Sequence, residues 1–143
     1  MGLEPEESAT LAPAPSGDTL HHVTILVCST CRNEAGEETA PTPGQQLFAA
    51  TRAAYERATD EEAAHIRVAS VECLGNCKRR LSASIVTSDC WTYVFGDLQL
   101  DNAADLLTGA RLMLDTPNGL MPWRGRPQCL KSGMVARVPP LGS

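Results

Sequence analysis

The sequence has few of the features that would suit it to a membrane or to nucleic acid. Aromatic residues make up 4% of its 143 residues, and no apolar run approaches the roughly 18 residues that a bilayer-spanning helix requires. The first residues lack the basic and apolar regions of a secretory signal peptide. A net charge of -5 is also far from the basic excess that usually accompanies nucleic-acid binding. These absences favour a soluble, cytoplasmic protein without a nucleic-acid or membrane partner.

The six cysteines are the most informative residue type that is present. In a reducing cytoplasm a disulfide framework is not expected, so cysteines there more often serve as metal ligands or as catalytic thiols. Their spacing therefore bears directly on function.

Composition divides the chain into three parts. Residues 1–20 mix Glu, Ala, Pro and Ser without periodicity and are predicted to be a disordered acidic tail. Residues 21–119 carry the hydrophobic patterns of a folded domain. Residues 120–143 are rich in Pro, Gly and Arg, and we expect an irregular segment that packs back on that domain.

The pattern of the middle part predicts an α/β fold with about four strands in a mixed sheet and two main helices. Strands are expected over residues 23–27, 65–71, 82–87 and 91–95, the last two joined by a hairpin. A helix should run from Pro43 to about Thr59, with Thr42 and Gln45 forming a capping box. A second helix should follow a cap at Asp101 or Asn102, and its expected buried face comprises Ala103, Leu106, Leu107, Ala110 and Leu114.

Four cysteines form two closely spaced pairs, Cys28 with Cys31 and Cys73 with Cys77. Each pair directly follows a predicted strand, and a predicted helix lies between the pairs. A βαβ unit of this kind is right-handed and has parallel strands, whose carboxyl ends meet at one edge of the sheet. We therefore expect both pairs to meet at that edge.

Four thiolates suit either an iron–sulfur cluster or a structural zinc ion. The basic residues Lys78, Arg79 and Arg80 would favour the reduced form of an anionic cluster, although they also suit a solvated turn. Zinc ribbons usually place their pairs about 15 to 20 residues apart, whereas a whole helix intervenes here. A redox dithiol at Cys28 and Cys31 is a third interpretation, but thioredoxins place such a pair at the start of a helix.

These features together resemble the thioredoxin-like [2Fe-2S] ferredoxins, which hold their cluster with two cysteines after the first strand and a C-x-x-x-C pair in a later loop. The first pair is closer together here than in that family, which keeps zinc open. The chain also resembles a bacterial family of small predicted metal-binding proteins, over residues 22–141. That resemblance rests on the motifs Val27-Cys28-Ser29-Thr30-Cys31-Arg32, Cys73-Leu74-Gly75-Asn76-Cys77-Lys78-Arg79, Thr92-Tyr93-Val94-Phe95-Gly96-Asp97-Leu98, Met121-Pro122-Trp123-Arg124-Gly125-Arg126-Pro127 and Ala136-Arg137-Val138-Pro139-Pro140-Leu141.

The first resemblance implies a thioredoxin-like fold, a [2Fe-2S] cofactor and an electron carrier without a substrate-turnover site. It also implies a protein redox partner, for which Lys78, Arg79 and Arg80 would be part of the docking face, and it is compatible with a homodimer. The second implies electron delivery or metal handling for cobalamin synthesis. The rival function is a zinc- or cobalt-binding structural or trafficking protein that uses the same four cysteines.

Several other residues have both a functional and a structural interpretation. Cys90 and Cys129 could be further ligands, but four thiolates already complete a [2Fe-2S] site, so spare thiols are favoured. His21 and His22 lie at the start of the first strand, at the end expected to be opposite Cys28, which disfavours ligation. The segment from Trp123 to Arg126 suits either a docking surface or packing that anchors the chain end.

Overall fold

The computed structural model describes residues 20–29, 41–58, 61–74 and 81–140. Ten elements follow one another in the chain: β2 (Val23–Cys28), α1 (Pro43–Arg57), η3 (Glu61–His65), β3 (Ile66–Val71), β4 (Ala83–Thr87), β5 (Thr92–Phe95), η4 (Leu100–Asn102), α2 (Ala103–Leu114), α3 (Cys129–Ser132) and β6 (Met134–Val138). Both η elements are short 3-10 helices. None of the helices in these ranges is long and apolar enough to cross a bilayer.

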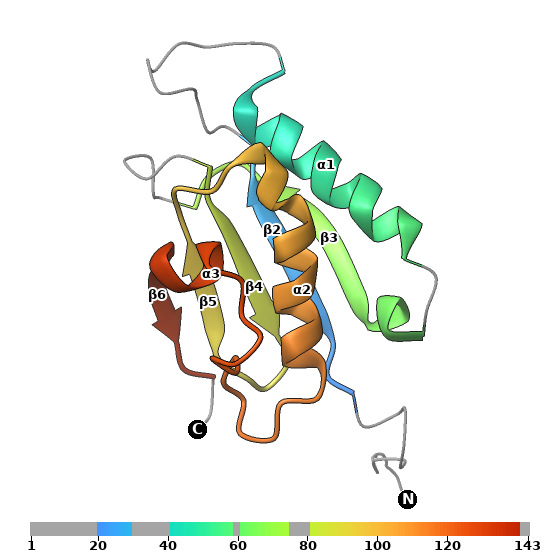
Figure 1. Cartoon of the computed structure of the whole chain (residues 1–143), viewed down its shortest axis with the longest axis vertical. Helices are drawn as coiled ribbons and strands as arrows, with labels where there is room; N and C mark the ends of the chain where they lie inside the picture. The colour runs from blue at the N-terminus through green and yellow to red at the C-terminus, as the bar shows by residue number, and fades with distance from the viewer. Residues whose placement is uncertain (1–19, 30–40, 59–60, 75–80, 141–143) are drawn as a thin grey trace, which may run out of the picture.

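The strands form one mixed sheet in the order β3-β2-β4-β5-β6 (Figure 1). Strands β2 and β3 are parallel and are joined through α1, as the sequence predicts for a βαβ unit. The remaining neighbours, β2 with β4, β4 with β5 and β5 with β6, are antiparallel. The carboxyl ends of β2 and β3 therefore lie side by side at one end of the sheet.

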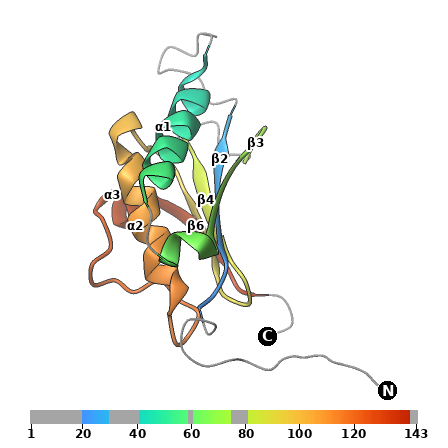
Figure 2. The same ribbon diagram turned by 90° about the vertical axis from the view of Figure 1, so that its right-hand side faces the viewer.

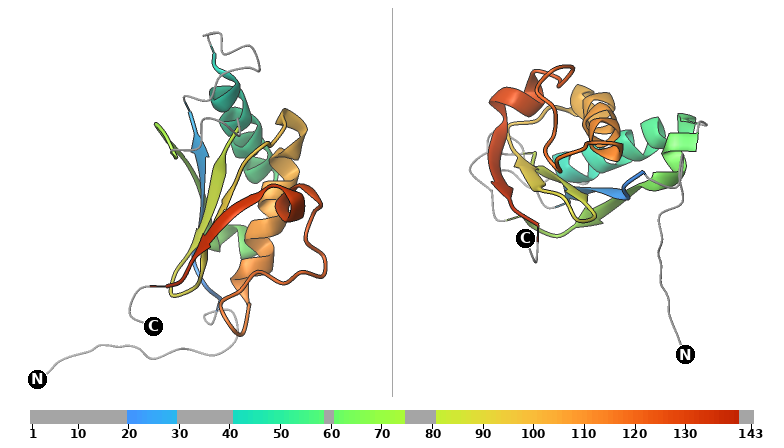
Figure 3. Two further views of the ribbon diagram at one scale, coloured as in Figure 1. Left: turned by 90° about the vertical axis from the view of Figure 1, so that its left-hand side faces the viewer. Right: turned by 90° about the horizontal axis from the view of Figure 1, so that it is seen from below.

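Helices α1 and α2 cover one face of the sheet, and α3 lies on the same side (Figures 2 and 3). The apolar residues that alternate along β2 are buried, which is the period-2 pattern of a strand with one face against a core. Within the described ranges, no helix covers the opposite face. The fully buried side chains include Val23, Ile25, Val27, Leu47, Ile66, Ile85, Tyr93, Phe95, Leu106, Met113, Leu114 and Leu130.

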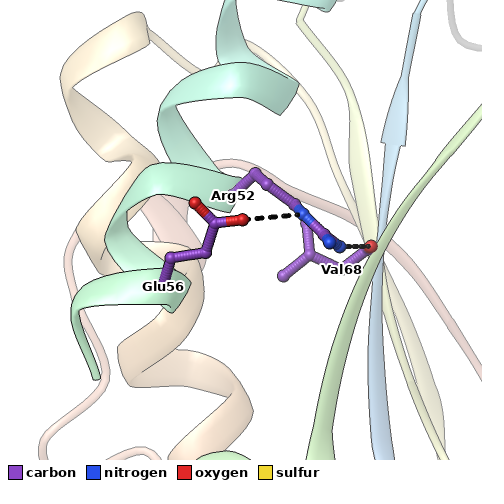
Figure 4. A network of polar contacts seen from close by, with 3 residues as sticks. All are labelled: Arg52, Glu56 and Val68. Atoms are coloured by element: carbon purple, nitrogen blue, oxygen red, sulfur yellow. Dashed lines mark hydrogen bonds and ion pairs between the residues drawn. The ribbon is translucent and has the colours of Figure 1, made fainter. Parts of the chain in front are cut away.

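Helix α1 begins where the capping box predicts. The Thr42 hydroxyl accepts from the Gln45 backbone N–H at 3.0 Å, and the Gln45 side chain accepts from the Thr42 N–H at 2.9 Å. Further along α1, Arg52 reaches the edge strand β3, donating to the Val68 carbonyl at 3.2 Å and pairing with Glu56 at 3.5 Å (Figure 4). These contacts fix the helix at both its start and its middle.

The C-terminal segment differs from its sequence-based prediction. Instead of an irregular segment, residues 129–138 form the short helix α3 and the strand β6, which adds a fifth strand to the four expected (Figure 3). Strand β6 is mostly exposed, so it lacks the strict alternation that reveals a half-buried strand. Its conformation comes from pairing with β5, with an irregularity between Val94 and Phe95.

Candidate metal centre

Two of the four predicted ligands lie at the shared end of β2 and β3. Cys28 is the last residue of β2 and stands opposite Val71, the last residue of β3, so Cys73 follows only two residues beyond that pair. The Cys28 thiol also lies 3.6 Å from the backbone carbonyl of Glu72. The parallel pairing thus brings Cys28 and the neighbourhood of Cys73 together, although 45 positions separate their numbers.

The backbone around Cys28 is held from three sides. The Cys28 N–H donates to the Ser82 carbonyl at 3.0 Å, and the Ser29 N–H donates to the Val71 carbonyl at 2.8 Å. From α1, the Thr42 hydroxyl donates to the Ser29 carbonyl at 2.6 Å. Strand pairing on both sides and a helix cap therefore fix the chain at the position where the first predicted ligand stands.

The first turn of α1 sits directly on this chain segment. Gly44 is buried, and a Cβ placed there would overlap the carbonyl oxygen of Cys28. Glycine is therefore required for the helix to approach so closely. The N-terminal end of a helix carries partial positive charge, so this contact favours negative charge, such as that of thiolates, near Cys28.

Of the four predicted ligands, the two that lie in the described residues, Cys28 and Cys73, have different environments. Cys28 is 4% exposed, whereas Cys73 is exposed. A reactive redox thiol must be accessible to its partner, so the burial of Cys28 weighs against the redox-dithiol interpretation. A ligand set with one buried and one exposed thiolate instead suits a bound group that has an inner side and a solvent side.

The other two predicted ligands, Cys31 and Cys77, lie outside the described residues, as do Lys78, Arg79 and Arg80. Within the described residues there is no group of three or more His, Cys, Asp or Glu side chains that could hold a metal ion. A metal centre at the β2–β3 end therefore needs thiolates from the segments 30–40 and 75–80. The donor chemistry fits, because cysteine thiolates are ligands of zinc and of iron–sulfur clusters, and Cys28 and Cys73 each stand two residues before one of these segments.

The other two described cysteines are not placed as ligands of this centre: Cys90 lies at the opposite end of the sheet, and the Cys129 thiol has a carboxylate partner. Cys90 is buried in the turn after β4, at the opposite end of the sheet, because β4 runs antiparallel to β2. Burial, with the nearby Asp89 carboxylate, raises the pKa of the Cys90 thiol. The Cys129 thiol donates to the Asp105 carboxylate at 3.5 Å. Burial, and then Asp105, raise the Cys129 pKa to about 12. Both therefore remain protonated at neutral pH.

The histidines also gather far from Cys28. His21 lies within hydrogen-bond distance (3.1 Å) of the Thr116 carbonyl through Nε2, and the ring of His22 lies 5.2 Å from the ring of His65. Because Val23 pairs with Ile66 at the start of the two parallel strands, these rings stand at the end opposite the cysteines. The placement of His21 and His22 agrees with the prediction that they lie at the end of the first strand opposite Cys28.

The segment from Trp123 to Arg126 was expected either to form a docking surface or to anchor the chain end, and its residues divide between these two interpretations. Arg126 is buried and donates to the Met121 carbonyl at 2.5 Å and to the Pro122 carbonyl at 3.3 Å, so it anchors the segment. Trp123 does not pack over the sheet, because it is 61% exposed. The arginine is structural, and the tryptophan is presented to solvent.

Two features of the structure could not be predicted from the sequence. The close contact of Gly44 with the Cys28 carbonyl depends on the distance between a helix and a strand end, which no local pattern encodes. An open cavity of about 750 Å³ beside α2 and α3 is likewise formed by residues from separate segments, with Asp97, Asp101 and Asp105 among its lining groups.

The comparisons with known proteins agree with this fold. A thioredoxin-like [2Fe-2S] ferredoxin from Aquifex aeolicus superposes with a TM-score of 0.56 at 12% sequence identity, covering 85% of this chain and 97% of the ferredoxin. At that identity the likeness concerns the fold, which is thioredoxin-like. No curated protein matches the chain. The family model described as "Protein of unknown function (DUF1636)" matches residues 25–140, and the chain therefore belongs to this family.

Proposed function

We propose that this protein is a small electron carrier whose [2Fe-2S] cluster is held by Cys28, Cys31, Cys73 and Cys77. The observation that carries the proposal is the register of β2 on β3, which sets Cys28 opposite Val71 and so brings the segments after both strands to one end of the sheet. The similar fold of a protein named as a [2Fe-2S] ferredoxin supports the same conclusion.

The described residues suit the task of ligation. The strand pairing and the Thr42 hydroxyl fix the backbone at Cys28 and Ser29, so the first thiolate would be held in place before the group binds. When bound, a cluster of this type supplies one-electron transfer, and the protein supplies ligation and the surrounding charge. The close N-terminal turn of α1 would help to balance the negative charge of the thiolates.

Electron exchange needs a side from which a partner can approach. Cys73 is exposed while Cys28 is buried, so the approach would be from the β3 side. Lys78, Arg79 and Arg80 follow Cys77 in the sequence, and we propose them as part of the docking face for a protein redox partner. A link to cobalamin synthesis stays a prediction, as does a homodimer.

Anaerobic purification followed by visible absorption, iron and acid-labile sulfide content, and EPR after dithionite tests the proposal. The expected result is a coloured protein with two iron and two sulfide per chain, as the [2Fe-2S] composition requires. A colourless protein with stoichiometric zinc and no sulfide would instead support the zinc-binding alternative.

Serine variants distinguish a shared site from a dithiol. Cys28→Ser and Cys73→Ser should both lose the iron and the visible absorption, because each removes one of four ligands. Cys90→Ser is the matched control, since Cys90 is buried to the same extent but lies at the opposite end of the sheet. If Cys28→Ser abolished disulfide-reducing activity while Cys73→Ser spared it, the protein would be a thiol redox protein.

A further inference from the structure

Each of the two tryptophans in the sequence has at least one cationic side chain over the face of its ring. The Arg137 guanidinium lies 4.9 Å from the centroid of Trp91. The Arg126 guanidinium lies 5.0 Å from the centroid of Trp123, and the Lys131 ammonium lies 4.9 Å from the same ring. At these distances a cation is attracted to the face of the ring.

These contacts are joined beneath the surface. The buried Arg126 also lies over the buried ring of Tyr93 at 5.6 Å, and Arg137 stands opposite Tyr93 in the pairing of β5 with β6. We call the solvent-accessible side chains around this buried link the cationic strip, and they are Trp91, Trp123, Arg124, Lys131 and Arg137.

The charge of the strip contrasts with that of the rest of the protein. Residues 116–143 contain four basic residues and no acidic one, whereas the remainder has eight basic and 17 acidic residues. In the described ranges no ion pair neutralises the cation of Arg124, Lys131 or Arg137. Acidic side chains border the strip on two sides: Asp89 lines a cavity with Trp91, and Asp97, Asp101 and Asp105 line the hollow beside α3, the helix that carries Lys131. The strip therefore suits a negatively charged, extended ligand.

The chain itself contains a segment of the required charge. Residues 1–19 carry Glu4, Glu6, Glu7 and Asp18 and no Lys or Arg, so they are opposite in charge to the three solvent-accessible cations of the strip, Arg124, Lys131 and Arg137. The segment also contains Leu3, Leu11 and three prolines, which can contact aromatic rings. The overall charge of -5 disfavours a nucleic acid as the ligand of this surface.

The segment also enters the described structure beside the strip. His21 donates its backbone N–H to the Leu114 carbonyl, and it lines a cavity of about 350 Å³ together with Trp91, Gly119 and Pro140. Nineteen residues in an extended chain reach about 60 Å, which exceeds the size of a domain this small. A segment tethered at this point is present at a high effective concentration for the strip.

We propose that the cationic strip binds the acidic N-terminal segment of the same chain, residues 1–19. The contact is independent of the metal centre, which lies at the opposite end of β2. It would cover the exposed face of Trp123 and keep other polyanions from the strip.

Tryptophan itself reports on this contact, because Trp91 and Trp123 are the two tryptophans in the sequence and both belong to the strip. In the full chain, Glu6→Gln with Glu7→Gln should increase acrylamide quenching of tryptophan fluorescence and shift the indole N–H signal of Trp123 in NMR spectra. The matched control, Glu56→Gln with Glu61→Gln, changes the net charge equally on α1 and η3 and should leave both signals as in the wild type.

The same experiment separates direct contact from a general effect of charge. In a chain that already carries Arg124→Gln and Lys131→Gln, the change at Glu6 and Glu7 should have no further effect. At 1 M salt, where the Debye length is about 3 Å, wild type and the Glu6/Glu7 variant should coincide.

Three results would overturn the proposal. The first is equal quenching of the wild type and the Glu6/Glu7 variant at low salt. The second is protection that grows with protein concentration, since it would place the segment on another copy. The third is protection of Trp123 by a single-stranded oligonucleotide to the same degree in wild type and variant, since the strip would then be an open nucleic-acid site.

Discussion

Gly44 in the first turn of α1 lies against the backbone carbonyl of Cys28, so closely that a methyl group on Gly44 would overlap the carbonyl oxygen. Two residues earlier, the Thr42 hydroxyl donates to the Ser29 carbonyl at 2.6 Å. The start of α1 and the end of β2 are therefore packed against each other. The position of Cys28, the first predicted ligand, depends on the position of the first turn of α1.

Gly44→Ala should destabilise the protein and weaken its cofactor site. Alanine is the better helix former by about 1 kcal/mol, but the overlap is with backbone, which cannot rotate away. Overpacking of this kind typically costs about 1 to 3 kcal/mol, so we expect a net loss of stability in urea unfolding. The displacement of Cys28 should also lower the iron bound per chain.

Gly109→Ala is the matched control for that variant. A methyl group there would press on the Cδ1 atoms of Leu130 and Ile85, which are the far ends of flexible side chains. We expect some loss of stability but unchanged iron content, because Gly109 lies in α2, away from Cys28. Equal iron content in Gly44→Ala and Gly109→Ala would contradict the coupling between α1 and the site.

Thr42→Ala should remove the helix cap and one support of the site together. The hydroxyl accepts from the Gln45 N–H and donates to the Ser29 carbonyl, and loss of such a cap costs about 0.5 to 2 kcal/mol. Thr108→Ala is the control, since Thr108 is exposed on α2, its hydroxyl donates to the Ala104 carbonyl one turn earlier at 3.2 Å, and surface changes usually stay within about 0.5 kcal/mol. Thermal unfolding of both variants measures the difference, and identical midpoints would show that the cap contributes nothing.

Much of the fold follows from local sequence, because the signals involved are local. The capping box at Thr42 and Gln45 fixes the start of α1, and the apolar spacing from Ala103 to Leu114 fixes the buried face of α2. The parallel pairing of β2 and β3 follows from general rules of chain connection, and so does the shared end at which Cys28 and Cys73 lie.

What the sequence could not supply is set by contacts between distant segments. Strand β6 has four exposed positions among its five, so only its pairing with β5 makes it a strand. The role of Gly44 depends on the separation between α1 and β2, which its neighbours in sequence do not encode. The predicted ligands Cys31 and Cys77 stay predictions, because they lie outside the described residues.

Tyr93→Phe should destabilise the C-terminal part of the molecule. The buried Tyr93 hydroxyl accepts from the Met121 backbone N–H at 2.9 Å, and phenylalanine would leave that N–H buried without a partner. The cost of such a group is about 1 to 3 kcal/mol, measurable by urea unfolding. Tyr55→Phe is the control on partly buried α1, where we expect a change within about 0.5 kcal/mol. Equal loss in the two variants would mean that the hydroxyl of Tyr93 is not engaged.

The Cys129 thiol should make stability depend on pH in the alkaline range. Its pKa is raised from 9.0 to about 12, first by burial and then by the Asp105 carboxylate. Below pH 9 the folded and unfolded chains both hold this proton, so the contribution is constant. Between pH 9 and 12 the unfolded chain loses the proton more readily, and the free energy of unfolding therefore falls as the pH rises.

A comparison of wild type with Cys129→Ala in urea, at intervals from pH 7.5 to 10.5, isolates this contribution. Linkage limits the slope from one proton to about 1.4 kcal/mol per pH unit, and partial exposure of the thiol will make the observed slope smaller. The variant should lack this part of the decline above pH 9, while the raised pKa of Cys90 contributes a decline that is common to both proteins. Ser132→Ala, a neutral change in the same short helix, should follow the wild type throughout. Parallel curves for wild type and Cys129→Ala would mean that burial and the Asp105 carboxylate do not raise the pKa of this thiol in the folded protein.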